Sequence, residues 1–283
     1  MYEFEHKILS TNKPEMNRAE KKKMNMLGIE MDCLSYNEMF SLFDQWLTDK
    51  STRSHTLSLI NVNCCVSALF DKRLRAIYNS TDIVGIDSMP FLLWARTFYN
   101  IDSNRLYAPD LLSEISSKAK DKKYTFYFYG GYSDAPDKVE AYLMERFQGI
   151  QVVGKDSPPF RELTIEEEQS MIDKINCAQP DFLWIGLGSP KQDIWIYNNR
   201  EKIRGSIIIP AGATFDFLSG RIKQAPKLIR DLGFEWLYRL TQDSRRLLIR
   251  YTAYNLIFVV LFTLQLLGIL RFEPTNIRYN SKV

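Results

Sequence analysis

Short apolar runs alternate with segments of helical periodicity along most of the chain. The apolar runs occupy residues 56–62, 81–86, 124–129, 150–153, 182–185 and 206–210. Between them, apolar residues recur at the spacing of one helix face, as at Val66, Leu69, Leu74 and Ile77. Short strands that alternate with helices are typical of an α/β fold. We therefore expect a Rossmann-like parallel sheet of about six strands with helices on both faces.

Two of the helices begin at capping boxes. Ser35 is followed by Glu38, and Thr164 is followed by Glu167, each before a run of helical periodicity. In such a box the hydroxyl and the carboxylate satisfy backbone N–H groups that the first helical turn leaves free. The pattern predicts that helices start directly after Ser35 and Thr164.

Polar residues and glycines follow the predicted strands at their carboxyl ends. In a parallel sheet these ends meet at one edge, where ligands bind. Glycine turns at this edge let the backbone approach an anionic group, particularly where a helix begins. The residues expected at this edge are Asn61, Asn63, Asp87, Ser88, Gly131, Gly186, Gly188, Lys191, Gln192 and Asp193.

The turn at residues 186–193, Gly-Leu-Gly-Ser-Pro-Lys-Gln-Asp, allows two interpretations. It could be the glycine fingerprint of a dinucleotide site, which would make the protein a nucleotide-dependent oxidoreductase. However, Lys191 stands where the third glycine is required, and the turn follows a late strand, not the first. We keep the oxidoreductase as the less favoured alternative and expect no cofactor.

Asp87 is the carboxylate best placed to act as a general base. It ends a predicted strand, so it would lie at the ligand edge, within reach of an attacking hydroxyl. It also precedes Pro90, so a helix N-cap is an equally good interpretation. Three other aspartates, Asp110, Asp193 and Asp216, compete for the role or serve as caps and salt-bridge partners.

Charge is distributed unevenly along the chain. The net charge is only +3, but residues 221–250 are rich in arginine and poor in acidic residues. These arginines and Arg105 could be solvated surface charges, or their forked guanidinium groups could clamp a diphosphate. The 4 cysteines show no metal-ligand spacing and there are only 2 histidines, so we expect no metal site. We also expect no nucleic-acid partner.

The C-terminal part of the chain is both basic and apolar. Residues 254–270 are strongly apolar and flanked by arginines, which fits a buried core helix, a membrane-spanning helix or an interfacial helix. The basic flanks favour membrane contact, with the arginines on the cytosolic side. We therefore divide the chain into a mobile polar tail (1–26), an α/β catalytic domain (27–220) and a helical, membrane-associating appendage (221–283). Exposed apolar surface on the appendage would also permit a homo-oligomer.

Four motifs give the chain a resemblance to a known family. They are residues 186–193, residues 212–220 (Gly-Ala-Thr-Phe-Asp-Phe-Leu-Ser-Gly), Ala225-Pro226 and residues 235–240 (Glu-Trp-Leu-Tyr-Arg-Leu). Over residues 27–251 the chain resembles the WecG/TagA/CpsF family of bacterial glycosyltransferases. The resemblance implies inverting, metal-independent transfer of a hexose or N-acetylhexosamine from a UDP-sugar to a polyprenyl-diphosphate-linked acceptor. N-acetylmannosamine, its uronic acid and glucose are candidate sugars.

The resemblance also implies a location and roles for individual residues. The enzyme would serve cell-surface polysaccharide synthesis at the cytoplasmic face of the bacterial cell membrane, peripheral or monotopic. Asp87 matches the catalytic aspartate of the family and would deprotonate the acceptor hydroxyl. The substrate-binding residues that match are Asn61, Asn63, Arg105, Gln192, Arg239, Arg246 and Arg250.

The chain departs from the family pattern at three places. Ser88 stands where the family usually has glycine, residues 107–110 replace a stretch that contains Thr-Gly, and Asp193 replaces glutamate. Ser88 and Asp110 would flank the pocket, so we count both among the substrate-binding residues. The departures bear on the identity of donor and acceptor, and they leave an inactive membrane-bound relative as a further alternative.

Overall fold

Eight strands form one twisted sheet in the order β1-β2-β4-β3-β8-β7-β5-β6. The computed structural model describes residues 22–49, 53–242 and 244–274. β1 and β2 pair antiparallel, and the other neighbouring strands pair in parallel. The strands are β1 (Lys23–Met26), β2 (Ile29–Asp32), β3 (His55–Ile60), β4 (Ile83–Ile86), β5 (Thr125–Gly130), β6 (Gln151–Asp156), β7 (Phe182–Gly186) and β8 (Ile207–Pro210).

The expected α/β fold with a mostly parallel sheet is confirmed, but the expected count of about six strands is too low. The two additional strands, β1 and β2, form a hairpin that turns at Leu27 and Gly28, both with positive φ. β1 lies within the residues that the sequence assigned to a polar tail. Its side chains alternate between exposed Lys23 and buried Met24 and Met26, a pattern too short to predict a strand.

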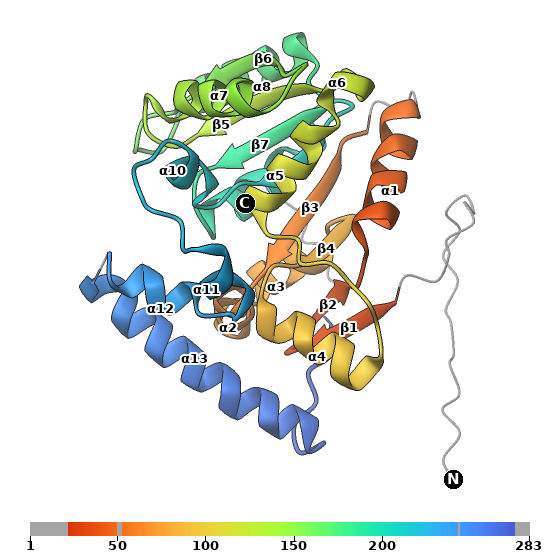
Figure 1. The fold of residues 1–283 in the computed structure, drawn as a ribbon, viewed down its shortest axis with the longest axis vertical. Coiled ribbons are helices and arrows are strands. Elements are labelled where there is room, and N and C mark those ends of the chain that lie inside the picture. The colour runs from red at the N-terminus through yellow and green to blue at the C-terminus, as the bar shows by residue number, and fades with distance from the viewer. Residues whose placement is uncertain (1–21, 50–52, 243, 275–283) are drawn as a thin grey trace.

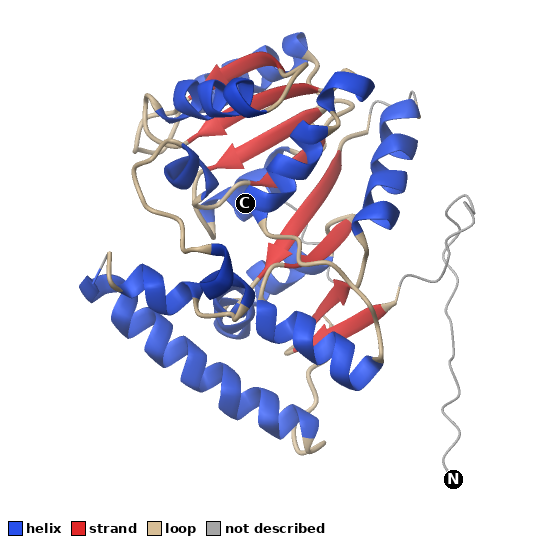
Figure 2. Cartoon of the chain, viewed as in Figure 1, coloured by secondary structure: helices blue, strands red, loops and turns tan. Residues whose placement is uncertain are grey.

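Helices on one face of the sheet enclose the first of its cores (Figure 2). They are α1 (Tyr36–Thr48), α5 (Ala108–Ser117), α6 (Ala119–Lys122), α7 (Ala135–Arg146) and α10 (Thr214–Leu218). Phe126 and Phe128 of β5 point into this core, and Tyr127 and Tyr129 point to the opposite face. This alternation, expected of a strand, lets the central strands bury side chains on both faces.

The opposite face carries two further clusters of buried side chains. One lies beneath α8 (Ile165–Ala178) and α9 (Lys191–Asn199), and the other includes α2 (Val62–Phe70), α3 (Lys72–Asn79) and α4 (Met89–Tyr99). Both predicted capping boxes are confirmed. The Ser35 and Thr164 hydroxyls accept from the backbone N–H groups of Glu38 and Glu167 at the starts of α1 and α8.

The C-terminal residues form three helices that pack below the sheet (Figure 1). They are α11 (Lys227–Asp231), α12 (Glu235–Leu240) and α13 (Ser244–Leu266). α13 lies against α2, buries Phe258 against Phe91 of α4, and accepts a hydrogen bond at Gln265 from the Leu27 backbone N–H (3.0 Å). Across the described residues, no helix has both the length and the apolar character needed to cross a membrane. The apolar segment at 254–270 is helical to Leu266. Phe258 places one side of this helix on the core.

Candidate active site

The carboxyl ends of β3 and β4 bring Asn61 and Asp87 together. Asn61 is the N-cap of α2, where its side-chain oxygen accepts from the Cys64 backbone N–H (3.2 Å). Its amide nitrogen donates to Oδ2 of Asp87 (3.2 Å). The Asp87 backbone N–H in turn donates to the Ile60 carbonyl (2.9 Å). The parallel pairing of β3 with β4 thus holds the amide and the carboxylate at one place on the sheet edge.

Asp87 is not a helix cap, because Ser88 occupies the N-cap position of α4. The Ser88 side chain makes no capping hydrogen bond. Oδ1 of Asp87 is buried and has no hydrogen-bond partner among the described residues. Buried polar atoms are normally paired, so the unpaired oxygen marks a position where a donor on a ligand would fit.

Burial, not the surrounding charge, gives the Asp87 carboxyl a pKa closer to neutrality. Burial raises the pKa of Asp87 to about 6, the nearby Arg105 opposes this rise, and the negative charge of Glu235 adds to it. Such a pKa lets a carboxylate act as a general base at neutral pH while keeping enough basicity to take a proton. The role of Asp87 as base stays a prediction.

Arg105 lies in the connection between α4 and α5 and contacts Asp87 in two ways. Its Nε donates to the Asp87 backbone carbonyl, and its Nη2 lies 3.6 Å from Oδ1 of Asp87. The guanidinium also stacks over the Tyr107 ring, 4.3 Å from the ring centroid. Only 17% of the Arg105 side chain is exposed, so the interpretation as a solvated surface charge does not hold.

The C-terminal segment closes over this edge through several polar contacts. Glu235 of α12 accepts from Nη2 of Arg105 (3.1 Å) and from the Tyr107 hydroxyl (2.7 Å). Gln224 donates to the same hydroxyl (3.2 Å). Arg230 of α11 donates to both carboxylate oxygens of Asp110 (2.7 and 3.0 Å). Asp110, expected to bind substrate, is thus paired with an arginine from the other end of the chain.

Sequence reasoning gave no role to Tyr107, Gln224 or Glu235, and it considered Arg230 only as one of the arginines between residues 221 and 250. The motif at 235–240 contains Glu235, so an acidic residue in an otherwise basic segment was the available signal. Arg239 of the same motif lies over the Phe217 ring (5.5 Å), and its charge lowers the pKa of Asp87. Arg246 and Arg250 lie in α13, but their side chains fall outside the part of the chain that the structure describes.

The glycines at the ends of β5 and β7 serve close packing. A Cβ on Gly130 would lie 2.6 Å from the Gly186 backbone, and a Cβ on Gly186 would lie 2.4 Å from the Phe215 ring. Gly131 donates its N–H to the Gly186 carbonyl (2.9 Å). Gly188 has a φ of +76°, and nothing would lie within 4 Å of its Cβ. At Gly188 the backbone conformation, not crowding, requires glycine.

The three residues at the polar end of the same turn differ in exposure and in hydrogen-bond partners. Lys191 is exposed. Gln192 is buried and accepts from the Gly212 N–H (3.1 Å), so it fixes the turn after β8. Asp193 is buried, accepts from the Ser189 hydroxyl (2.8 Å), and has a pKa raised to about 6 by burial. Among the described residues, each carboxylate oxygen of Asp193 either has a hydrogen-bond partner or reaches solvent.

The remaining predicted residues take varied positions. Asn63, in the first turn of α2, has a buried Oδ1 with no hydrogen-bond partner among the residues described. Asp216 of α10 has a pKa raised by burial, which Arg221 and Arg239 oppose. Asn63 and Asp87 thus each have one buried oxygen that accepts no hydrogen bond among the described residues, although Oδ1 of Asp87 lies 3.6 Å from Arg105. The competing Asp110 and Asp193 are hydrogen-bonded.

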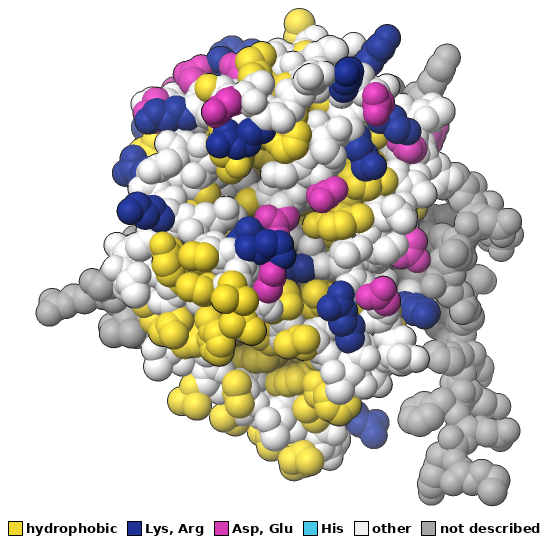
Figure 3. All heavy atoms as spheres, viewed as in Figure 1, with side chains coloured by type: hydrophobic (Ala, Val, Ile, Leu, Met, Phe, Trp, Pro, Cys, Tyr) yellow, Lys and Arg dark blue, Asp and Glu magenta, His cyan; other side chains and the backbone are white. Residues whose placement is uncertain are grey.

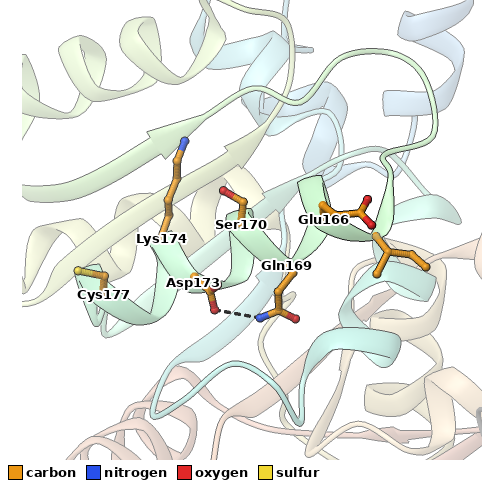
Figure 4. A pocket seen from close by; sticks show the side chains of 7 residues that line it. Glu166, Gln169, Ser170, Asp173, Lys174 and Cys177 are labelled. Atoms are coloured by element: carbon orange, nitrogen blue, oxygen red, sulfur yellow. Dashed lines mark hydrogen bonds between the residues drawn. The ribbon is translucent and has the colours of Figure 1, made fainter.

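A surface hollow lies elsewhere, along α8 (Figure 4). It is lined by Ile165, Glu166, Gln169, Ser170, Asp173, Lys174 and Cys177. Gln169 donates to Asp173 within it (2.9 Å). None of the predicted site residues lines this hollow. In the described part of the chain, no group of three or more His, Cys, Asp and Glu side chains is placed to hold a metal ion.

The comparison with known protein families agrees with the geometry at the sheet edge. The model of the glycosyl transferase WecG/TagA/CpsF family matches residues 24–271. This match begins at the β1–β2 hairpin and includes the edge with Asp87, the turn after β7 and α11 to α13. The chain therefore belongs to the WecG/TagA/CpsF family and is a glycosyltransferase of cell-surface polysaccharide synthesis.

Proposed function

We propose that the enzyme transfers a hexose or N-acetylhexosamine from a UDP-sugar to a polyprenyl-diphosphate-linked acceptor, with inversion and without a metal. The observation that carries the proposal is the buried, unpaired Oδ1 of Asp87 at the sheet edge. Asp87 takes the proton of the acceptor hydroxyl as that oxygen forms a bond to the anomeric carbon. The bond from this carbon to the donor diphosphate breaks, and its electron pair leaves with UDP.

The side chains around Asp87 suit the other needs of this single displacement. Arg239 and the nearby arginines supply positive charge where the diphosphate gains negative charge, which is commonly the largest catalytic contribution. The Asn63 amide oxygen and the Ser88 hydroxyl are available to sugar or nucleotide hydroxyls. Gln192 orders the Gly212 turn that forms the opposite wall. Attack from one face and departure from the other give inversion.

A donor screen tests the activity directly. The purified chain is incubated with a lipid-linked acceptor extract and, separately, UDP-glucose, UDP-N-acetylglucosamine, UDP-N-acetylmannosamine and the uronic acid of the last. At least one donor should release UDP only when acceptor is present. Because ligand binding raises thermal stability, UDP should raise Tm and NAD should not. Stabilisation by NAD without UDP would instead support an oxidoreductase, and no turnover with any donor would support an inactive relative.

Apolar side chains on α11 to α13 support membrane contact at the cytoplasmic face. Figure 3 shows hydrophobic side chains gathered over this part of the molecule. In α12 and the turn before it, the exposed large apolar residues are Leu232 (58%), Phe234 (51%) and Leu237 (50%). Further exposed residues on α13 include Leu256, Val259 and Val260. Large contiguous apolar patches mark protein or membrane interaction sites, and the acceptor here is a lipid.

Vesicle binding tests the membrane contact. Replacing Leu232, Phe234 and Leu237 together by serine should weaken co-sedimentation with phosphatidylglycerol–phosphatidylethanolamine vesicles at least about tenfold, since each loses apolar burial. A matched control replaces two side chains that are still more exposed but lie elsewhere, Phe160 (79%) and Ile165 (84%). Equal weakening by both sets would contradict the assignment. If only the first set dissociates an oligomer and vesicle binding is unchanged, a second copy covers this surface.

A further inference from the structure

One guanidinium is shared between two carboxylates at the edge of the sheet. Nη2 of Arg105 lies 3.1 Å from Oε2 of Glu235, a hydrogen bond, and 3.6 Å from Oδ1 of Asp87, which is too long for one. The three side chains are exposed by 17%, 14% and 18%, respectively. Charges this well shielded from solvent influence each other more strongly than surface charges do. The position of Arg105 therefore matters to Asp87.

Glu235 is itself held from its other side. Its Oε1 accepts from the Tyr107 hydroxyl (2.7 Å), while its Oε2 accepts from Arg105. The Tyr107 hydroxyl also accepts from Gln224 (3.2 Å), and the Tyr107 ring lies under the Arg105 guanidinium. With a donor on each of its oxygens, Glu235 is poorly placed to take a proton from substrate. Its role is to hold other groups.

Arg105 lies closer to Glu235 (3.1 Å) than to Asp87 (3.6 Å), so the loss of Glu235 would change the surroundings of Asp87. Without Glu235, the nearest carboxylate to Nη2 of Arg105 would be Asp87, and a small shift would tighten their 3.6 Å ion pair into a hydrogen bond on Oδ1. A paired oxygen is a weaker base and is less available to a substrate hydroxyl. Oδ1 is the atom that has no hydrogen-bond partner among the described residues.

We propose that Glu235 is a positioning residue of the transfer reaction, which draws the Arg105 guanidinium away from Oδ1 of Asp87 and so keeps that oxygen free for the acceptor hydroxyl. This inference rests on the proposed role of Asp87 as the base. In agreement with it, the charge of Glu235 raises the pKa of Asp87 and that of Arg105 lowers it. The direct effect of the Glu235 charge on Asp87 acts in the same direction as the withdrawal of Arg105.

The test is the pH profile of kcat/KM in Glu235→Gln, with the fastest donor of the screen and the lipid-linked acceptor extract. The amide oxygen can still accept from Arg105, whereas the amide nitrogen can only donate, to the Tyr107 hydroxyl, and the side chain lacks the charge. The acidic limb should move about one pH unit lower, since Arg105 then acts on Asp87 alone. The plateau rate should fall about tenfold, because a less basic carboxylate is a poorer proton acceptor.

Two variants complete the test. Glu140→Gln is the control, because Glu140, at 20% exposure, also forms an ion pair, with Lys155 (40% exposed); its limb should stay in place. Glu235→Asp keeps the charge but withdraws it by one methylene, so the limb should move the same way by less. An unmoved limb in whichever Glu235 variants fold would overturn the inference. If Asp87→Asn were fully active, the proposed base would fail instead.

Discussion

Two buried carboxyl groups, Asp87 and Asp193, follow different strands of the sheet and have the same raised pKa of about 6. Burial is the first cause in both cases. The side chain of Asp87 remains 18% exposed and faces Arg105, Arg239 and Glu235. Asp193 is 6% exposed, and its principal polar partner is the Ser189 hydroxyl at 2.8 Å.

The difference separates a poised carboxylate from a satisfied one. The Asp193 carboxyl is hydrogen-bonded within its own turn, next to the Gln192 side chain that fixes Gly212. Asp87 has two arginines and a second carboxylate around it. Its own Oδ1 accepts no hydrogen bond among the described residues. A raised pKa therefore does not identify a base by itself. An unpaired oxygen at the ligand edge, surrounded by charge that substrate can engage, is the more informative feature.

The largest expected effect is on turnover. Asp87→Asn removes the proton acceptor without changing size, so the rate of sugar transfer should fall about 10²- to 10⁴-fold. Asp193→Asn can keep the hydrogen bond from Ser189, so its rate should remain within about tenfold of the parent. Both are measured as UDP released per enzyme with the best donor and acceptor extract. Comparable losses in the two variants would erase the distinction between the two carboxylates.

The next effect is the pH dependence of the rate. Asp87 must be deprotonated to act as base, so kcat/KM should rise with pH and level off above about 6. Each pH unit below that value should cost about tenfold, so the loss between pH 6 and pH 4 approaches a hundredfold. The limb should survive in Asp193→Asn. Its disappearance in that variant would mean that Asp193, not Asp87, controls the titration.

The edge that carries Asp87 follows from local sequence rules. Apolar runs ending in polar residues predicted strands that stop at Asn61 and Asp87, and parallel pairing of β3 with β4 brings these ends together. Both capping boxes were readable because their partners are three residues apart. Features that depend only on neighbouring residues could therefore be predicted from the sequence.

The contacts made by Glu235 could not be predicted in the same way. Its partners Arg105 and Tyr107 are 130 and 128 residues away along the chain, and nothing in local periodicity relates them. The β1–β2 hairpin was missed for a different reason, because its strands have four residues each and their burial depends on α2, α4 and α13. Pairing across the fold requires the tertiary arrangement.

The smallest effect concerns stability, and its size distinguishes the two carboxyls again. A carboxyl with a raised pKa binds its proton more tightly when folded, so folding is penalised above its ordinary pKa of 3.8 and most fully above about 6. Asp193→Asn removes this penalty and should increase the free energy of unfolding at pH 7.5 by up to about 3 kcal/mol, and by less at pH 4.5. Asp87→Asn should gain less, because Arg105 loses an anionic partner. Urea denaturation of both variants at the two pH values provides the measurement. Destabilisation of Asp193→Asn at pH 7.5 would mean that the ionised Asp193 carboxylate has favourable partners, and the contrast with Asp87 would no longer hold.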